Sequence, residues 1–92
     1  MIDVSVIGCG NMGGALLTGL SRAGGYRITA YDVDPDALDA VSEHCDRTTT
    51  DLGDVRDSEV VVLAVKPDIV PIVLEDLDLR PGQTLVTIAA GV

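Results

Sequence analysis

The stretch VSVIGCGNMG at residues 4–13 decides the fold class of this chain. A short, mostly β-branched run ends at a glycine turn, and a helical pattern of apolar residues begins inside that turn. Gly8 permits the tight turn, Gly10 lets the backbone approach an anion because it has no Cβ, and Gly13 allows the helix to pack closely on the strand. Glycines with this spacing between a strand and a helix predict a turn that holds the pyrophosphate of a dinucleotide.

The first helix is expected to run from Asn11 to Ala23 and to end at the pair Gly24-Gly25, which readily adopts positive φ. Unpaired N–H groups and the positive end of the helix dipole at Asn11 and Met12 would face the anion. The simpler alternative is a glycine turn that binds no ligand.

Strands are expected at residues 4–7, 28–31, 60–65 and 85–89, where apolar and β-branched residues are concentrated. The continuous run at residues 60–65 is typical of a central parallel strand that is buried on both faces.

Two further helices are expected between these strands. One begins at Asp34 as N-cap before Pro35, and the other opens at Pro67-Asp68 with Pro71 in its first turn. The apolar face of the second is expected to comprise Ile69, Ile72, Val73 and Leu77. Residues 46–57 are polar and poorly periodic, which predicts a loop with a short turn of helix.

The resulting order, βαβαβαβ with short connections, predicts an α/β fold: a Rossmann-type parallel sheet of four strands in the order 3-2-1-4. A complete dinucleotide-binding fold has about six strands. We therefore expect residues 1–92 to be the N-terminal dinucleotide-binding domain of a longer protein, truncated after its fourth strand.

Composition excludes several functional classes. Fifteen acidic residues against six basic ones give a net charge of −9, which repels nucleic acid and anionic membranes. No apolar run approaches the ~18 residues of a membrane span, and the N-terminus lacks the basic region of a signal peptide, so a cytoplasmic protein is expected. Many Asp residues with a single Lys favour adaptation to a high-salt cytoplasm, although an ordinary acidic protein has the same charge.

Asp32 is the expected partner of the glycine turn. It lies 19 positions after Gly13, close to the ~20 typical of the acid that binds the cofactor ribose. A carboxylate accepts hydrogen bonds from ribose hydroxyls and repels a 2′-phosphate, which favours NAD over NADP. The alternative is a solvated carboxylate at a strand end.

Neither a disulfide nor a metal site is expected from Cys9, Cys45 and His44, the only cysteines and histidine. Two candidate ligands at His44 and Cys45 are too few for a zinc site. Cys9 lies near a helix N-terminus that lowers thiol pKa values, but the need for a small residue in the turn is the preferred interpretation.

Three motifs together resemble the pyrroline-5-carboxylate reductase family. They are VIGCGNMG at residues 6–13, LAVKP at residues 63–67 and TIAAGV at residues 87–92. The resemblance implies transfer of hydride from NAD(P)H to the C=N bond of 1-pyrroline-5-carboxylate, which yields proline. It also implies that residues 64–67 line the cofactor toward its nicotinamide half and that residues 89–91 border the nicotinamide.

The same resemblance places Asp51 at a position that is often Asn and contacts the adenosine ribose. The expected cofactor-binding residues are Gly8, Cys9, Gly10, Asn11, Met12, Gly13, Asp32, Asp51, Ala64, Val65, Lys66, Pro67, Ala89, Ala90 and Gly91. No catalytic residue is expected in this chain. The backbone at Lys66 is expected to shape the cofactor pocket. The alternative is that the Lys66 side chain transfers a proton. The family often uses NADPH, so the choice between NAD and NADP stays open despite Asp32.

In this family a helical C-terminal domain, absent here, binds the small-molecule substrate and forms the homo-oligomer. These 92 residues are therefore expected to bind cofactor without turnover. Alternatives are the cofactor domain of a deazaflavin-dependent NADP reductase or of a 3-hydroxyisobutyrate-type dehydrogenase, and a non-catalytic nucleotide-sensing regulatory domain.

Overall fold

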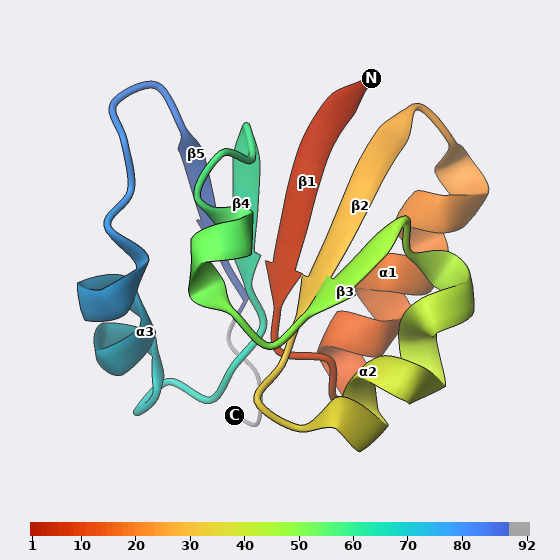
Figure 1. The fold of residues 1–92 in the computed structure, drawn as a ribbon, viewed down its shortest axis with the longest axis horizontal. Coiled ribbons are helices and arrows are strands. Elements are labelled where there is room, and N and C mark those ends of the chain that lie inside the picture. The colour runs from red at the N-terminus through yellow and green to blue at the C-terminus, as the bar shows by residue number, and fades with distance from the viewer. Residues whose placement is uncertain (89–92) are drawn as a thin grey trace.

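The computed structural model describes residues 1–88 of the chain (Figure 1). Within these residues five parallel strands form one sheet in the order β3-β2-β1-β4-β5. The strands are β1 (Ile2–Ile7), β2 (Tyr26–Tyr31), β3 (Arg47–Thr49), β4 (Val60–Leu63) and β5 (Thr84–Thr87). The helices are α1 (Asn11–Ala23), α2 (Pro35–Val41) and α3 (Val70–Leu77), with short 3-10 helices η1 (Ser42–His44) and η2 (Leu52–Val55).

The Rossmann-type α/β fold is confirmed, but the sheet has one strand more than the four expected. The additional strand, β3, lies in the segment that was predicted to be a loop, and η2 supplies the predicted turn of helix. Among residues 1–88, β3 pairs with β2 alone and its other edge has no strand beside it, and Thr49 is its only buried residue. A short, half-exposed edge strand needs no apolar run, which is why the pattern was missed.

The extra strand changes the place of the apolar run at residues 60–65. Its strand is β4, the fourth in the chain, and it lies beside β1 with Val4 opposite Val60 and Ile7 opposite Leu63. The order 3-2-1-4 holds once β3 is counted as the third strand.

The two faces of the sheet carry separate parts of the core, on alternate residues of the strands. Helices α1 and α2 pack on one face, where Val6, Leu17 and Val62 are buried. Helix α3 and η2 pack on the other, where Val61 and Leu77 are buried (Figure 1). Both core clusters are predominantly aliphatic, in line with the scarcity of aromatic residues.

Local sequence signals predicted the start of α2 correctly and the start of α3 incorrectly. Asp34 caps α2 as expected, because its Oδ1 accepts a 3.0 Å hydrogen bond from the N–H of Asp36. Helix α3, however, begins at Val70 and not at Pro67, since residues 67–69 form a turn in which Ile69 donates to the Lys66 carbonyl. Pro71 lies in the first turn of α3, as predicted.

The expected apolar face of α3 is only half buried. Val73 and Leu77 pack against the sheet, whereas Ile69 and Ile72 are exposed, Ile72 by 58%. Both isoleucines line a cavity near the carboxyl ends of the strands. Among residues 1–88 the structure has no helix with the length and apolar character needed to span a bilayer.

Candidate functional site

The site forms where the carboxyl ends of β1, β2 and β4 meet. After β1 the chain moves through β2 to β3 on one side, and it then returns to place β4 on the other side of β1. Ligands bind at such a switch point in open α/β sheets, because the loops on either side diverge there. A groove of about 440 Å³ opens at this point, lined by Gly8, Gly10, Asn11, Met12, Asp32, Ala64, Val65, Lys66 and Ile69.

The glycines of the turn have different physical roles. Gly8 has φ +98°, and a Cβ there would lie 2.7 Å from the carbonyl oxygen of Ala64. A Cβ at Gly13 would lie 1.8 Å from the carbonyl oxygen of Gly8, so α1 could not pack on the turn. A Cβ at Gly10 would have no atom within 4 Å, so no contact within the described protein requires glycine at this position. Of the three glycines of the turn, Gly10 is the one at which a Cβ would meet open space, and it lines the groove.

The N-terminus of α1 opens onto this groove. Its N-cap is Gly10, and no side chain in the described part of the chain caps the helix. The first helical hydrogen bond runs from the N–H of Gly14 to the Gly10 carbonyl at 2.7 Å. Asn11 and Met12 line the groove and are exposed. An anion in the groove would therefore meet the positive end of the helix dipole and backbone N–H donors.

Asp32 holds the turn in place. Its Oδ2 accepts a 2.9 Å hydrogen bond from the N–H of Cys9, and its Oδ1 accepts a 3.0 Å bond from the N–H of Asp34. A carboxylate has about four lone-pair sites, so acceptor capacity remains for ribose hydroxyls. Asp32 also lines the groove, as its position at the end of β2 predicted.

Cys9 has its backbone in the turn and its side chain in the core. It is 6% exposed, and its Sγ donates to the Tyr31 carbonyl at 3.4 Å. Burial, followed by the charges of Asp32 and Cys45, raises the pKa of this thiol to about 12. The thiol therefore stays protonated near neutral pH, which agrees with a requirement for a small residue and not for a reactive one.

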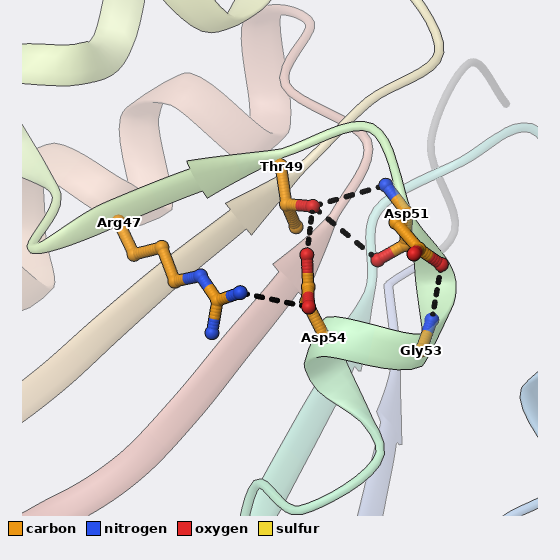
Figure 2. Close-up of polar contacts among 5 residues, drawn as sticks. All are labelled: Arg47, Thr49, Asp51, Gly53 and Asp54. Atoms are coloured by element: carbon orange, nitrogen blue, oxygen red, sulfur yellow. Dashed lines mark hydrogen bonds and ion pairs between the residues drawn. The ribbon is translucent and has the colours of Figure 1, made fainter.

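Asp51 lies outside the groove lining. Figure 2 shows it just beyond β3, where its Oδ1 accepts a 2.9 Å hydrogen bond from the N–H of Gly53. Its own N–H donates to Oγ1 of Thr49, which in turn donates to Oδ2 of Asp54 at 2.5 Å, and Arg47 pairs with Asp54 at 2.7 Å (Figure 2). The structure thus places Asp51 as the cap of η2, with one carboxylate oxygen already engaged.

The LAVKP motif follows β4 into the groove. Ala64 is buried and donates to the Ile7 carbonyl at 2.8 Å, which fixes the start of the loop beside the glycine turn. Val65 and Lys66 line the groove, whereas Pro67 is exposed and does not. The expected contacts at Ala89, Ala90 and Gly91 lie outside the described residues.

A second cavity, of about 250 Å³, adjoins the groove and was missed in the sequence. It is lined by Ile7, Gly8, Tyr31, Asp32, Val33, Leu52, Val65, Ile69, Ile72, Val73 and Asp76. The available signal was the spacing of Ile69, Ile72, Val73 and Asp76, which fall on one face of a helix.

Fold and groove together define a Rossmann-type domain whose groove lies where such folds bind dinucleotides. The chain belongs to the family described as NADP oxidoreductase, coenzyme F420-dependent, whose model matches residues 3–91.

Individual relatives agree with the resemblance seen in the motifs. The chain is 36% identical over 97% of its length to pyrroline-5-carboxylate reductase of Methanosarcina acetivorans. It is 34% identical over 99% of its length to pyrroline-5-carboxylate reductase 2 of Rattus norvegicus. It spans about a third of these relatives, 36% and 31% of their lengths.

Among solved structures, a prephenate dehydrogenase from A. aeolicus in complex with hydroxyphenyl propionate and NAD+ is similar. It superposes with a TM-score of 0.84 at 26% identity, over 95% of this chain and 33% of that one.

Proposed function

We propose that this chain binds NAD(P)H and supplies the cofactor-binding part of a reductase that converts 1-pyrroline-5-carboxylate to proline. The observation that carries the cofactor assignment is the space kept clear at Gly10, opposite an uncapped helix N-terminus and beside Asp32. The three motifs and the similarity to pyrroline-5-carboxylate reductases support the reaction.

The residues present fit a dinucleotide. The pyrophosphate would bind at Gly10, Asn11 and Met12, and the adenosine ribose at Asp32. The adenine would occupy the adjoining apolar cavity, and the nicotinamide half would extend toward Val65 and Lys66. When bound, NAD(P)H supplies the hydride, and this chain binds and orients the cofactor.

Asp32 favours NADH over NADPH in this proposal. A 2′-phosphate would lie against a carboxylate that two backbone N–H groups already hold in place. The like charges repel, whereas the 2′-hydroxyl of NADH is a hydrogen-bond donor to the same oxygens.

Substrate binding and assembly into a homo-oligomer are proposed to depend on residues beyond this chain, because the relatives are about three times as long. The protein is proposed to act in the cytoplasm on a small-molecule substrate, without nucleic acid or membrane partners. The 92 residues alone are proposed to bind cofactor without turnover.

Calorimetric titration of the 92-residue chain with NADH and NADPH tests the cofactor assignment. We expect saturable binding of both, tighter for NADH, and binding weakened at least about tenfold in Gly10→Ala. A coupled assay for proline formation by the chain alone is expected to show no activity. Absence of any dinucleotide binding would contradict the cofactor assignment. Proline formation by the chain alone would contradict the proposal that turnover needs residues beyond these 92.

A second candidate is a deazaflavin-dependent NADP reductase, because the matching family is described by coenzyme F420. Asp32 argues against it, since that reaction requires the 2′-phosphorylated cofactor. Strong preference for NADPH in the titration would remove this argument against the candidate, but it would not by itself favour the candidate, because pyrroline-5-carboxylate reductases also often use NADPH.

A further inference from the structure

Two charged residues line the cavity beside the groove, and they come from different elements. Asp32 comes from the end of β2, and Asp76 comes from the last turn of α3. The rest of the lining is apolar apart from Tyr31 and the backbone of Gly8. At about 250 Å³ the cavity is below the roughly 300–1,000 Å³ of pockets that hold whole ligands, so it suits a single ring system.

We propose that Asp76 is a specificity-determining residue that accepts a hydrogen bond from the exocyclic amino group of the adenine and so selects adenine over hypoxanthine. The inference rests on the proposed function, because it takes the adenosine half of the cofactor as the occupant of the cavity.

The chemistry of the base sets the direction of this contact. Adenine is joined to ribose through N9, and its amino group at C6 lies on the opposite edge of the ring system. With the ribose at Asp32, a ring in the cavity would extend from the end of β2 toward α3, which lines the cavity through Ile72, Val73 and Asp76, and would bring its C6 edge to that side. Asp76 is the one hydrogen-bonding side chain that α3 contributes to this lining in the described structure.

The discrimination follows from the hydrogen-bonding character of the two bases. An ionised carboxylate only accepts hydrogen bonds, and the adenine amino group only donates them. Hypoxanthine has a carbonyl oxygen at the same position, which would place acceptor against acceptor there; its N1–H donor lies at the neighbouring ring position and not at the position of the proposed contact. The contact is therefore favourable for one base and repulsive for the other.

The surroundings of Tyr31 support a negative field in this part of the molecule. Burial raises the pKa of the Tyr31 hydroxyl, and the charges of Asp32, Asp51 and Asp76 raise it further. Asp76 of α3 thus acts on the same ring as the acids at the ends of β2 and β3. A carbonyl oxygen entering the cavity would meet this field, whereas an amino group is attracted by it.

The test compares NAD with nicotinamide hypoxanthine dinucleotide, whose base has a carbonyl at C6 and a hydrogen on N1 where adenine has an amino group and an unprotonated N1. Calorimetric titration of the 92-residue chain is expected to show about tenfold tighter binding of NAD, a ratio typical of one hydrogen bond to a charged group. Asp76→Asn is expected to bring the ratio close to one, since an amide offers a donor as well as an acceptor.

Glu75→Gln is the matched control. It removes the same charge from the neighbouring position of α3, but Glu75 does not line the cavity. The ratio is expected to stay near tenfold in this variant. Asp76 is exposed, so melting curves of all three proteins should coincide and exclude a folding effect.

A ratio near one in the unaltered chain, or an unchanged ratio in Asp76→Asn, would overturn the inference while leaving the proposed function intact. Failure of both dinucleotides to bind would overturn the proposed function and the inference with it.

Discussion

The backbone N–H of Cys9 donates a 2.9 Å hydrogen bond to Oδ2 of Asp32. This bond joins the glycine turn after β1 to the acid at the end of β2, two features that are 23 positions apart in the chain. The proposed pyrophosphate site and the proposed ribose site are therefore parts of one hydrogen-bonded unit. A change at Asp32 alters both the charge offered to the ribose and the support of the turn.

Asp32→Asn is expected to shift cofactor preference toward NADPH. The amide keeps an oxygen that can accept from the Cys9 N–H, but it removes the charge that repels a 2′-phosphate. We expect NADPH binding to strengthen about tenfold and NADH binding to weaken a few-fold, measured by calorimetry. Asp32→Ser should weaken NADH binding more, because it also loses the bond to the turn.

Asp36→Asn controls for the loss of one acidic charge in an already acidic protein. Asp36 is exposed on α2 and does not line the groove or the cavity. Equal shifts toward NADPH in both variants would contradict a specific role for Asp32.

Gly13→Ala is expected to destabilise the fold by about 3 kcal/mol. Its Cβ would lie 1.8 Å from the Gly8 carbonyl oxygen, so α1 and the turn would have to separate. Gly19→Ala, in the same helix with nothing within 4 Å, should stabilise by about 0.5–1 kcal/mol. Urea unfolding measures both, and similar midpoints for the two variants would refute the close packing at Gly13.

Gly10→Ala separates ligand binding from folding. Because a Cβ at this position meets nothing in the protein, the free energy of unfolding should stay within about 0.5 kcal/mol. Cofactor affinity should fall at least about tenfold, because the methyl group stands where the pyrophosphate approaches. Undiminished affinity for NADH would place the pyrophosphate elsewhere.

Stability is expected to fall as pH rises above about 9, in part through Cys9. Burial raises the pKa of its thiol from 9.0 to about 12 in the folded state. Between these values the unfolded chain has released the proton and the folded chain retains it, so ionisation favours unfolding. Cys9→Ala should therefore lose less stability than the unaltered chain between pH 8 and pH 11 in urea titrations. Parallel pH profiles would show that the thiol does not contribute.

The network at β3 is expected to depend on Asp54 more than on Arg47. Asp54→Ala leaves the buried Thr49 hydroxyl without its 2.5 Å partner and should cost about 1–2 kcal/mol. Arg47→Ala removes only an exposed ion pair and should cost less than about 1 kcal/mol. Thermal melting measures both changes. Equal losses in the two variants would show that the ion pair, which both remove, and not the hydroxyl contact, holds η2 against β3.

Salt adaptation predicts that the chain melts at a higher temperature in molar KCl than in dilute buffer. A net charge of −9 on 92 residues repels itself when it is unscreened. Equal melting temperatures in the two buffers would contradict the salt-adapted interpretation and leave an ordinary acidic protein.

Much of the fold could be predicted from local sequence patterns. The bounds of α1, the cap of α2 at Asp34 and the central strand near residues 60–65 rest on glycine conformation, side-chain capping and runs of β-branched residues. Such signals act over a few residues, so they survive without knowledge of the partner elements. The edge strand β3 and the late start of α3 carry weaker local signals, so β3 was not predicted and the start of α3 was predicted too early.

By itself, then, the sequence determined the Rossmann-type fold class and the glycine turn with its acid. Only the tertiary structure decided that Cys9 and Asp32 share a hydrogen bond, that Asp51 lies outside the groove and that Asp76 and Tyr31 line one cavity. The physical reason is that a local motif specifies its own backbone, whereas a cavity wall is assembled from separate elements. Which side chains of β2, β4 and α3 meet there depends on strand register and helix placement, and these are set by packing across the whole sheet.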